Sequence, residues 1–215
     1  MAIAAVLIAG CGSPAPSGPP PGIPKKSPLA TAAPSATLPK DGEEVAVLVT
    51  NKGRIVLRLF PDKAPKTVDN FKKLVRQKFY DGLLFHRVVP KFVIQSGCPN
   101  TRTEDRRTYG MGGPGYTIPL EKTDLSHDRG VLGMARGEEP NSAGSQFFIS
   151  VLPQPELNPS DKEPGYCAFG IVLEGMNAVD RISNLPRDSR DVPNAENPAI
   201  IETATIQTWP VPPAQ

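Results

Sequence analysis

The sequence places an arginine and a glutamine in an otherwise apolar stretch. This stretch runs from Phe85 to Gln95 as FHRVVPKFVIQ, and it reads as two short strands that meet near Pro90. A guanidinium is seldom buried unless it is paired or used, so Arg87 is a candidate for chemistry. Because a guanidinium is planar and always charged, Arg87 would act as a hydrogen-bond donor and not as a base. An edge-strand arginine that reaches water is the alternative interpretation.

A second block of similar character lies about fifty residues further along the chain. It begins with Gly133-Met134-Ala135-Arg136 and continues from Asn141 as NSAGSQFFI. In this order the two blocks resemble the cyclophilin-type peptidyl-prolyl isomerases. The family pattern is Phe-His-Arg, then Pro-x-Phe-x-x-Gln, then Met-Ala, then Asn-x-x-Gly-Ser-Gln-Phe-Phe-Ile. The resemblance covers roughly residues 44–209, and it is the pair of blocks that makes it specific.

The resemblance implies a site made of ten residues. Two would be catalytic. Arg87 would donate to the prolyl nitrogen, and Gln95 would orient Arg87 and meet the substrate carbonyl. An apolar socket for the proline ring is implied at Phe92, Val93, Phe148 and Leu157. The groove that binds the rest of the peptide is implied at Ala135, Arg136, Gln146 and Tyr166. No metal and no cofactor is required.

Several positions depart from the family pattern. Lys91 stands where glycine is common, Val93 where methionine is common, and Arg136 where asparagine is common. Tyr166 falls where many members have histidine. The resemblance implies that the backbone of Arg136 still serves the groove. We interpret His86 as structural, because alternation along a strand turns it away from the neighbouring arginine.

Composition indicates one globular domain with an appendage. Of 26 prolines in 215 residues, nine fall within the first 40, which predicts a tail. The net charge is +2, and the first 40 residues carry three lysines and no acid. The remaining 21 basic and 22 acidic residues predict a near-neutral domain, so we expect no nucleic-acid binding.

The three cysteines, Cys11, Cys98 and Cys167, have neither metal-ligand nor redox spacing. With only two histidines, His86 and His127, a histidine-based metal site is not expected. The sequence leaves open whether Cys98 and Cys167 form a disulfide.

The N-terminus predicts export. An apolar run over 2–9 ends in Ile8-Ala9-Gly10-Cys11, which resembles a bacterial lipobox whose cysteine is lipidated. No Lys or Arg precedes the run, and a chance apolar N-terminus is the alternative. We expect a signal segment over 1–11, a disordered Pro-rich linker over 12–40 and an isomerase domain over 41–215. The protein would then be a membrane-anchored lipoprotein on the extracytoplasmic side, in the periplasm or at the cell surface.

Hydrophobic periodicity predicts about eight short strands and two helices. Besides those of the first stretch and one from Val131, strands are expected over 45–49, 54–59, 146–151, 167–172 and 200–208. Helices are expected over 65–78 and 175–182. The class is mainly β. The resemblance implies a closed eight-stranded antiparallel barrel capped by two α-helices.

The expected function is peptidyl-prolyl cis–trans isomerisation in exported proteins, without covalent intermediates and assisted by Arg87. Proline-containing polypeptides would be the substrates and partners, with the membrane reached only through the lipid anchor, and we expect a monomer. The alternative is a non-catalytic peptide-binding module or holdase chaperone with the same fold.

Overall fold

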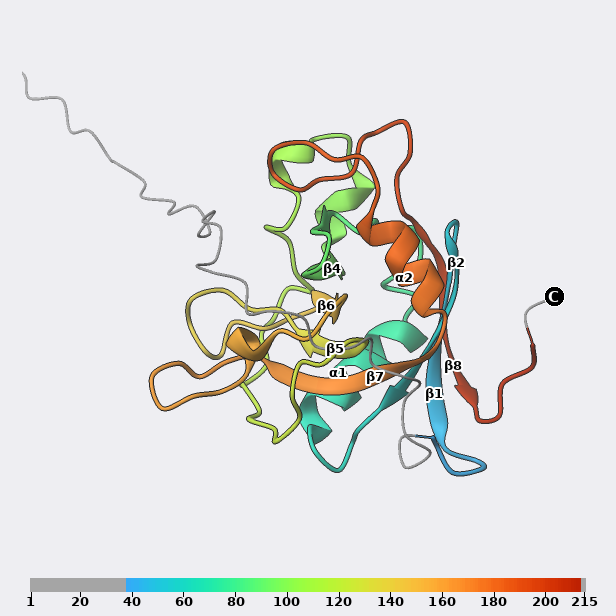
Figure 1. Ribbon diagram of the computed structural model, residues 1–215, viewed down its shortest axis with the longest axis vertical. Coiled ribbons are helices and arrows are strands. Elements are labelled where there is room, and N and C mark those ends of the chain that lie inside the picture. The colour runs from blue at the N-terminus through green and yellow to red at the C-terminus, as the bar shows by residue number, and fades with distance from the viewer. Residues whose placement is uncertain (1–37, 214–215) are drawn as a thin grey trace, which may run out of the picture. The chain divides into compact units, whose positions relative to one another are not determined.

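A computed structural model of the chain describes residues 38–213, and these fold as one antiparallel sheet with two α-helices (Figure 1). The strands are β1 (Glu44–Thr50), β2 (Gly53–Leu59), β3 (Arg87–Val88), β4 (Val93–Ser96), β5 (Val131–Met134), β6 (Phe147–Ser150), β7 (Cys167–Glu174) and β8 (Ile201–Thr208). The helices are α1 (Pro65–Arg76) and α2 (Met176–Ser183), with short 3-10 turns η2 (Pro99–Arg102), η3 (Arg106–Thr108) and η4 (Pro155–Leu157). The mainly β class with two helices is therefore confirmed.

The strands form one curled sheet in the order β3-β4-β6-β5-β7-β2-β1-β8. The ladder does not join β3 to β8 within residues 38–213, so the closed barrel that the resemblance implied is not shown. The segments just before these two strands do meet. Leu84 bridges Ile200, and the Ile201 N–H donates to the Leu83 carbonyl over 2.8 Å. Because β3 is two residues long, it offers little edge for a longer ladder.

The first hairpin shows why β1 reads as a continuous apolar run. The hairpin turns at Asn51 and Lys52, between the two strands predicted over 45–49 and 54–59, with Gly53 at a φ of +127°. Alternate residues of β1 and β2 point to opposite sides. One side joins the main core through Ala46, Leu48, Ile55 and Leu57. The other side joins a small cluster of Val45, Val47, Val56 and Val211. Both faces of the hairpin are thus buried.

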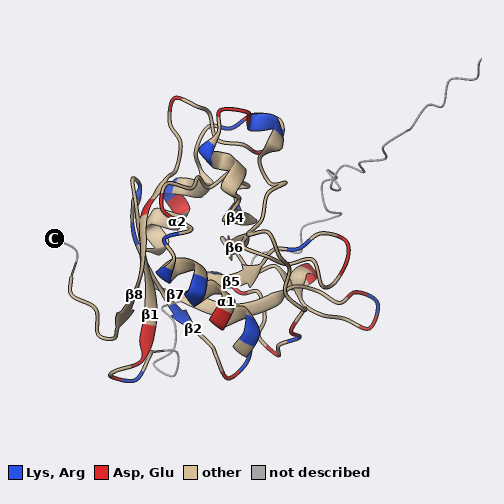
Figure 2. Ribbon diagram, turned by 180° about the vertical axis from the view of Figure 1, so that it is seen from behind, with Lys and Arg blue, Asp and Glu red and all other residues tan. Residues whose placement is uncertain are grey.

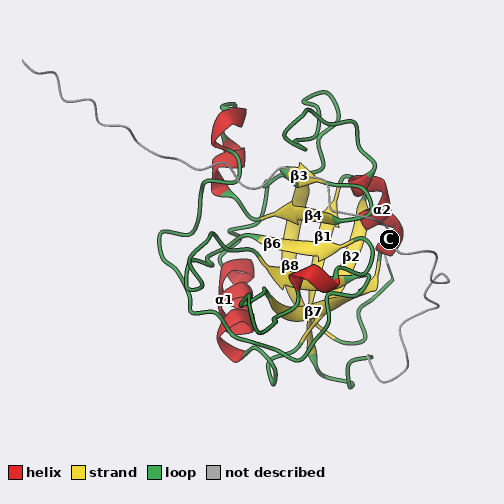
Figure 3. Cartoon of the chain, turned by 60° about the vertical axis from the view of Figure 1, so that its left-hand side comes forward, coloured by secondary structure: helices red, strands yellow, loops and turns green. Residues whose placement is uncertain are grey.

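The two helices cover opposite sides of the strands (Figure 3). Each buries one apolar face in the same core, α1 through Val68, Phe71, Leu74 and Val75 and α2 through Ala178, Val179 and Ile182. The helical spacing of Val68, Phe71, Leu74 and Val75, and that of Met176, Val179 and Ile182, predicts both elements. Met176 is partly buried and packs against this core. Aromatic rings fill the space under α1, where Phe71 meets Phe147 edge-on at 5.4 Å and Phe169 at 5.4 Å.

The N-terminus of α1 is capped by a residue from a distant loop. Ala64 at the N-cap has no side chain that can accept a hydrogen bond. Instead the Glu121 carboxylate accepts from the Lys66 N–H at 3.0 Å and from the Thr67 N–H and hydroxyl, both at 2.7 Å. A carboxylate satisfies the free N–H groups there and suits the positive end of the helix dipole. This contact fixes the loop before β5 onto α1.

Lys and Arg of α1 lie among acidic residues of neighbouring segments, and Figure 2 shows the two signs interspersed on the face it presents. Lys72 and Arg76 both pair with Glu44 of β1, at 3.1 Å and 2.6 Å. Neither described helix is long and apolar enough to cross a bilayer.

Both cysteines of the described domain are free thiols. Cys98 and Cys167 are buried and unpaired, which answers the question that the sequence left open. Cys167 lies 3.5 Å from the Thr67 hydroxyl, and burial raises the pKa of its thiol to about 11. Such a thiol stays protonated and unreactive at neutral pH. Cys11, with the signal segment over 1–11 and most of the linker over 12–40, lies outside the described residues.

Candidate active site

Arg87 and Gln95 face one another across the β3–β4 pair. The next pair inward, Val88 and Ile94, belongs to the main core. Between the strands the chain reverses tightly, and the Phe92 N–H donates to the Val89 carbonyl over 3.0 Å. The predicted pair of strands joined near Pro90 is therefore confirmed.

Period-2 alternation along this stretch of the sequence predicts that Phe85 shares a face with Arg87 and that Phe92 shares a face with Ile94. The structure contradicts this prediction. In the structure Phe85 and Ile94 lie in the main core, while the Arg87 side chain is 40% exposed and Phe92 packs in a separate cluster. Alternation holds only within a strand, and β3 begins at Arg87 while β4 begins after Phe92.

Arg87 is held by an aromatic ring and a carboxylate. Its guanidinium carbon lies 5.6 Å from the centre of the Phe92 ring. Its Nε lies 3.9 Å from Oδ2 of Asp191, which comes from the loop between α2 and β8. Asp191 could not be found from the sequence, because that loop has no periodicity and nothing in its spacing relates it to β3.

The four residues of the implied socket form one apolar cluster. Val93, Phe148 and Leu157 are buried in it. Phe92, Ala135 and Tyr166 are partly buried and pack against them. The cluster draws on β4, β6 and η4, and it lies apart from the main core. The structure therefore brings together six residues that the resemblance placed in the site.

Phe148 lies at the centre of this cluster and is 4% exposed. His127 stacks on its ring at 5.5 Å with an interplanar angle of 25°, and Tyr166 meets the ring edge-on at 5.6 Å. His127 Nδ1 lies 3.0 Å from the Asn158 side-chain oxygen, which holds the imidazole in place. His127 was not predicted as part of the site, because it lies in a turn before β5 and outside the motifs that indicate the site.

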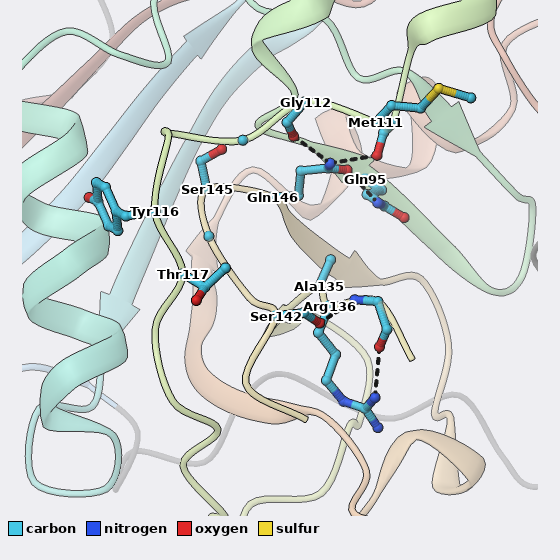
Figure 4. A pocket seen from close by; sticks show the side chains of 14 residues that line it. Gln95, Met111, Gly112, Tyr116, Thr117, Ala135, Arg136, Ser142, Ser145 and Gln146 are labelled. Carbon is cyan, nitrogen blue, oxygen red and sulfur yellow. Dashed lines mark hydrogen bonds between the residues drawn. The ribbon is translucent and has the colours of Figure 1, made fainter. Parts of the chain in front are cut away.

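Gln95 and Gln146 form a hydrogen-bonded relay to a neighbouring loop (Figure 4). Gln95 Nε2 donates to Gln146 Oε1 over 2.9 Å, and Gln146 Nε2 donates to the carbonyls of Gly110 (2.7 Å) and Gly112 (2.9 Å). The N–H groups of the same two glycines donate to Cys98 Sγ over 3.2 and 3.3 Å. No hydrogen bond joins the side chains of Gln95 and Arg87 in the described chain, so the orienting role of Gln95 stays a prediction.

The side chain of Arg136 turns away from the two glutamines (Figure 4). It stacks 4.9 Å over the Tyr166 ring, and its Nε donates to the Gly165 carbonyl over 3.0 Å. Its Nη1 donates to the carbonyls of Gly137 and Glu138. The guanidinium therefore joins two loops on the rim of the groove.

A polar pocket of about 350 Å³ adjoins the apolar cluster. Gln95, Ala135, Arg136 and Gln146 line one side, and the segment from Gly110 to Thr117 lines the other. Asn70 of α1 bridges two residues that line this pocket. It accepts a hydrogen bond from the Tyr116 hydroxyl and donates one to the Gly144 carbonyl, both over 2.7 Å.

His86 is not available as a base. It is buried beside Arg87, and neither ring nitrogen has a hydrogen-bond partner of good geometry in the described part of the chain. Burial, opposed in part by the Leu84 backbone and Gln146, lowers the pKa of His86 to about 4. The imidazole is therefore neutral at pH 7. No group of three or more His, Cys, Asp or Glu within residues 38–213 could hold a metal ion.

A curled antiparallel sheet with a helix on either side, and a groove that sets a guanidinium beside an apolar cluster, define a cyclophilin-like peptide-binding domain. The family model of cyclophilin-type peptidyl-prolyl cis-trans isomerases matches residues 45–206. The chain belongs to this family. Its membership supports peptidyl-prolyl isomerase activity, and the non-catalytic alternative is not favoured.

Individual relatives agree with this assignment. Peptidyl-prolyl cis-trans isomerase B of Bacillus subtilis is 42% identical over 139 residues, which are 64% of this chain and 88% of the relative. A peptidyl-prolyl cis-trans isomerase of Acinetobacter baylyi is 41% identical over 140 residues, which are 64% of this chain and 70% of the relative. A crystal structure of a Cryptosporidium parvum cyclophilin, obtained in the presence of the dipeptide Ala-Pro, superposes with a TM-score of 0.67 at 30% identity. That comparison covers 76% of this chain and 99% of the other.

Proposed function

We propose that this groove accelerates rotation about X–Pro bonds without covalent chemistry, with Arg87 as the donor to the twisting peptide. The observation that carries the proposal is the position of Arg87 against Phe92, at the edge of the cluster that contains Val93, Phe148 and Leu157. One charged donor thus adjoins the kind of apolar surface that a proline ring would occupy.

The chemistry follows from the origin of the barrier. Rotation about an X–Pro bond costs about 20 kcal/mol, because the twisted state loses amide resonance. In that state the nitrogen lone pair leaves conjugation and can accept a hydrogen bond. A donor directed at this nitrogen stabilises the twisted state more than either planar isomer, which is the condition for catalysis. An acceleration of five orders of magnitude requires about 7 kcal/mol from Arg87 and the socket together.

The remaining residues would bind and orient the peptide. We propose that the proline ring rests on Phe148 and Val93, with Phe92 and Leu157 on its flanks. Gln95 would meet the substrate carbonyl. The segment before proline would lie along Ala135, the Arg136 backbone, Gln146 and Tyr166. The hydrogen bond from Gln95 to Gln146 supports this arrangement, because it fixes both amides at the junction of socket and pocket.

Replacement of Arg87 tests this proposal. We expect Arg87→Ala to lose at least a hundredfold in kcat toward an Ala-Pro peptide, while thermal unfolding stays close to that of the wild type. The matched control is Arg107→Ala, because Arg107 is an exposed arginine that pairs with Asp105 and does not line the pocket. Activity should also survive a metal chelator. Full turnover in Arg87→Ala would favour the peptide-binding module.

We further propose that the protein is a monomeric lipoprotein that acts on exported proteins. The support is the sequence Ile8-Ala9-Gly10-Cys11 followed by a Pro-rich linker. Each buried CH₂ of an acyl chain contributes about 0.8 kcal/mol, and stable anchoring takes two signals. Cys11→Ser should move the protein from the membrane fraction to the soluble fraction with isomerase activity unchanged. A wild-type protein that is already soluble and unlipidated in its own host would contradict this proposal.

We also propose that the bridge between Leu84 and Ile200 closes the sheet into a barrel in solution. The support is the pair of backbone hydrogen bonds from Ile201 to Leu83 and from Phe85 to Ala199. The amides of Phe85 and Ile201 should then exchange with solvent as slowly as those of β1. Rapid exchange at both would indicate an open edge.

A further inference from the structure

Asp191 lies between two guanidinium groups, one of which is that of Arg87. Its Oδ2 is 3.9 Å from Arg87 Nε, and its Oδ1 is 3.3 Å from Arg187 Nε. Its backbone carbonyl also accepts a hydrogen bond from the Val88 N–H over 2.8 Å. The same residue is therefore joined to β3 by its backbone and faces the arginine of β3 with its side chain.

The backbone of Asp191 has a conformation that few residues adopt. Its φ is +62°, in the left-handed region that glycine, asparagine and aspartate tolerate best. A tight turn imposes this conformation. The Asp191 N–H donates to the Asp188 carbonyl over 3.0 Å, and Asp188 Oδ1 accepts from the N–H groups of Arg190 (2.9 Å) and Val192 (3.1 Å). The carboxylate of Asp191 is thus presented from a fixed turn.

We infer that Asp191 is a positioning residue for Arg87, an inference that rests on the catalytic role proposed for that arginine. Arg87 is 40% exposed at its side chain and has several rotatable bonds, so it needs more than one contact to stay in a single orientation. The Phe92 ring supports one face of the guanidinium. The carboxylate of Asp191 pairs with Nε. Neither terminal amino group has a hydrogen-bond partner among residues 38–213, so both can donate to a substrate.

Arg187 completes this arrangement by holding the other carboxylate oxygen of Asp191. The pair joins residues of one loop, and it orients Oδ2 of Asp191 toward β3. Removing the charge of Asp191 should therefore allow Arg87 to sample orientations in which its amino groups miss the substrate. We expect this change to lower kcat and to leave KM nearly unchanged, because peptide binding depends on the apolar cluster.

The test is Asp191→Asn. Asparagine also tolerates a positive φ, so the turn is kept while the charge is removed. We expect kcat for an Ala-Pro peptide to fall about two- to fivefold at low salt, with KM within twofold of wild type. This fall equals about 0.4–1 kcal/mol, within the range of a partly exposed ion pair. Added salt screens the pair, so wild-type kcat should decrease toward that of the variant, whose kcat stays constant.

The matched control is Asp188→Asn in the same turn. It keeps an Oδ1 acceptor for the turn and weakens the pair of Asp188 with Arg190, which lies at 3.2 Å. Its kcat and salt dependence should equal those of the wild type. The inference is overturned if Asp191→Asn keeps wild-type kcat, or if Asp188→Asn shows the same loss. It is also overturned if Asp191→Asn raises KM alone, because the carboxylate would then contact the substrate.

The Arg87→Ala variant distinguishes a failure of the proposed function from a failure of the positioning role of Asp191. If that variant stays active, the proposed function fails, and the role of Asp191 fails with it. If Arg87→Ala is inactive while Asp191→Asn turns over as the wild type does, only the positioning role of Asp191 is wrong.

Discussion

A methyl group added at Gly133 should disable the site through Phe148. Gly133 and Phe148 are directly paired across β5 and β6, and the Phe148 ring lies over the glycine. A Cβ at position 133 would lie 2.6 Å from Cε2 and 2.8 Å from Cε1 of that ring. Carbon atoms cannot approach so closely, so the ring must move. Its other sides are occupied by His127 and Tyr166, which leaves displacement toward the socket.

The size of the effect follows from the cost of overpacking. Forcing a methyl group into a packed cluster costs about 1–3 kcal/mol. If this cost falls on the peptide-bound state, Gly133→Ala should lower kcat/KM for an Ala-Pro peptide by about 5- to 150-fold. If part of it falls on the fold, the midpoint of thermal unfolding decreases as well. Both quantities need to be measured on the same preparation.

Two further variants test whether the effect comes from contact between the added methyl group and the Phe148 ring. Gly113→Ala is the matched control, because Gly113 lines the same groove and a Cβ there meets nothing within 4 Å. It should behave as the wild type does. Adding Gly133→Ala to Phe148→Leu should cost less stability than adding it to the wild type, since leucine can yield space. If Gly133→Ala keeps the kcat/KM and the unfolding midpoint of the wild type, the Phe148 ring does not pack against Gly133 as described.

Three other substitutions test features of the fold. Lys91 has a φ of +65°, so Lys91→Gly should stabilise the domain by about 0.5–1 kcal/mol in urea unfolding, and a loss of stability would show that the turn is not strained. Glu121→Ala removes the acceptor of three hydrogen bonds from Lys66 and Thr67, and should cost about 1–2 kcal/mol by the same measurement, whereas an unchanged midpoint would mean that water replaces the cap. The folded pKa of His86 is about 4 and its unfolded pKa about 6.5, so the unfolded chain binds more protons between these values. Stability is therefore complete above pH 6.5 and should fall by about 3 kcal/mol as the pH drops to 4. His86→Leu should remove this fall, and an equal fall in that variant would assign it to other groups.

The sequence determined the elements whose signals are local. Val68, Phe71, Leu74 and Val75 recur at helical spacing, and α1 buries these four residues. The turn at Asn51 and Lys52 lies between two apolar runs, and β1 and β2 pair around it. Such patterns are local because the side chains of one helix face or one hairpin are close in the chain.

The apolar cluster was predictable for a different reason. Phe92, Val93, Phe148 and Leu157 were assigned through motifs of a family, which carry tertiary information that periodicity lacks. Where only periodicity was used, over 85–95, the assignment of faces failed because the strands were shorter than the pattern.

Only the tertiary structure decided which distant residues complete the site. Asp191 lies about a hundred residues from Arg87 in the chain, and Glu121 lies more than fifty from Lys66 and Thr67, whose N–H groups it caps. These contacts arise where loops cross the ends of the sheet, and loop sequences have no period from which their partners follow. The identity and spacing of residues therefore determined the strands and helices, while the packing of those elements determined which charged and polar groups meet at Arg87.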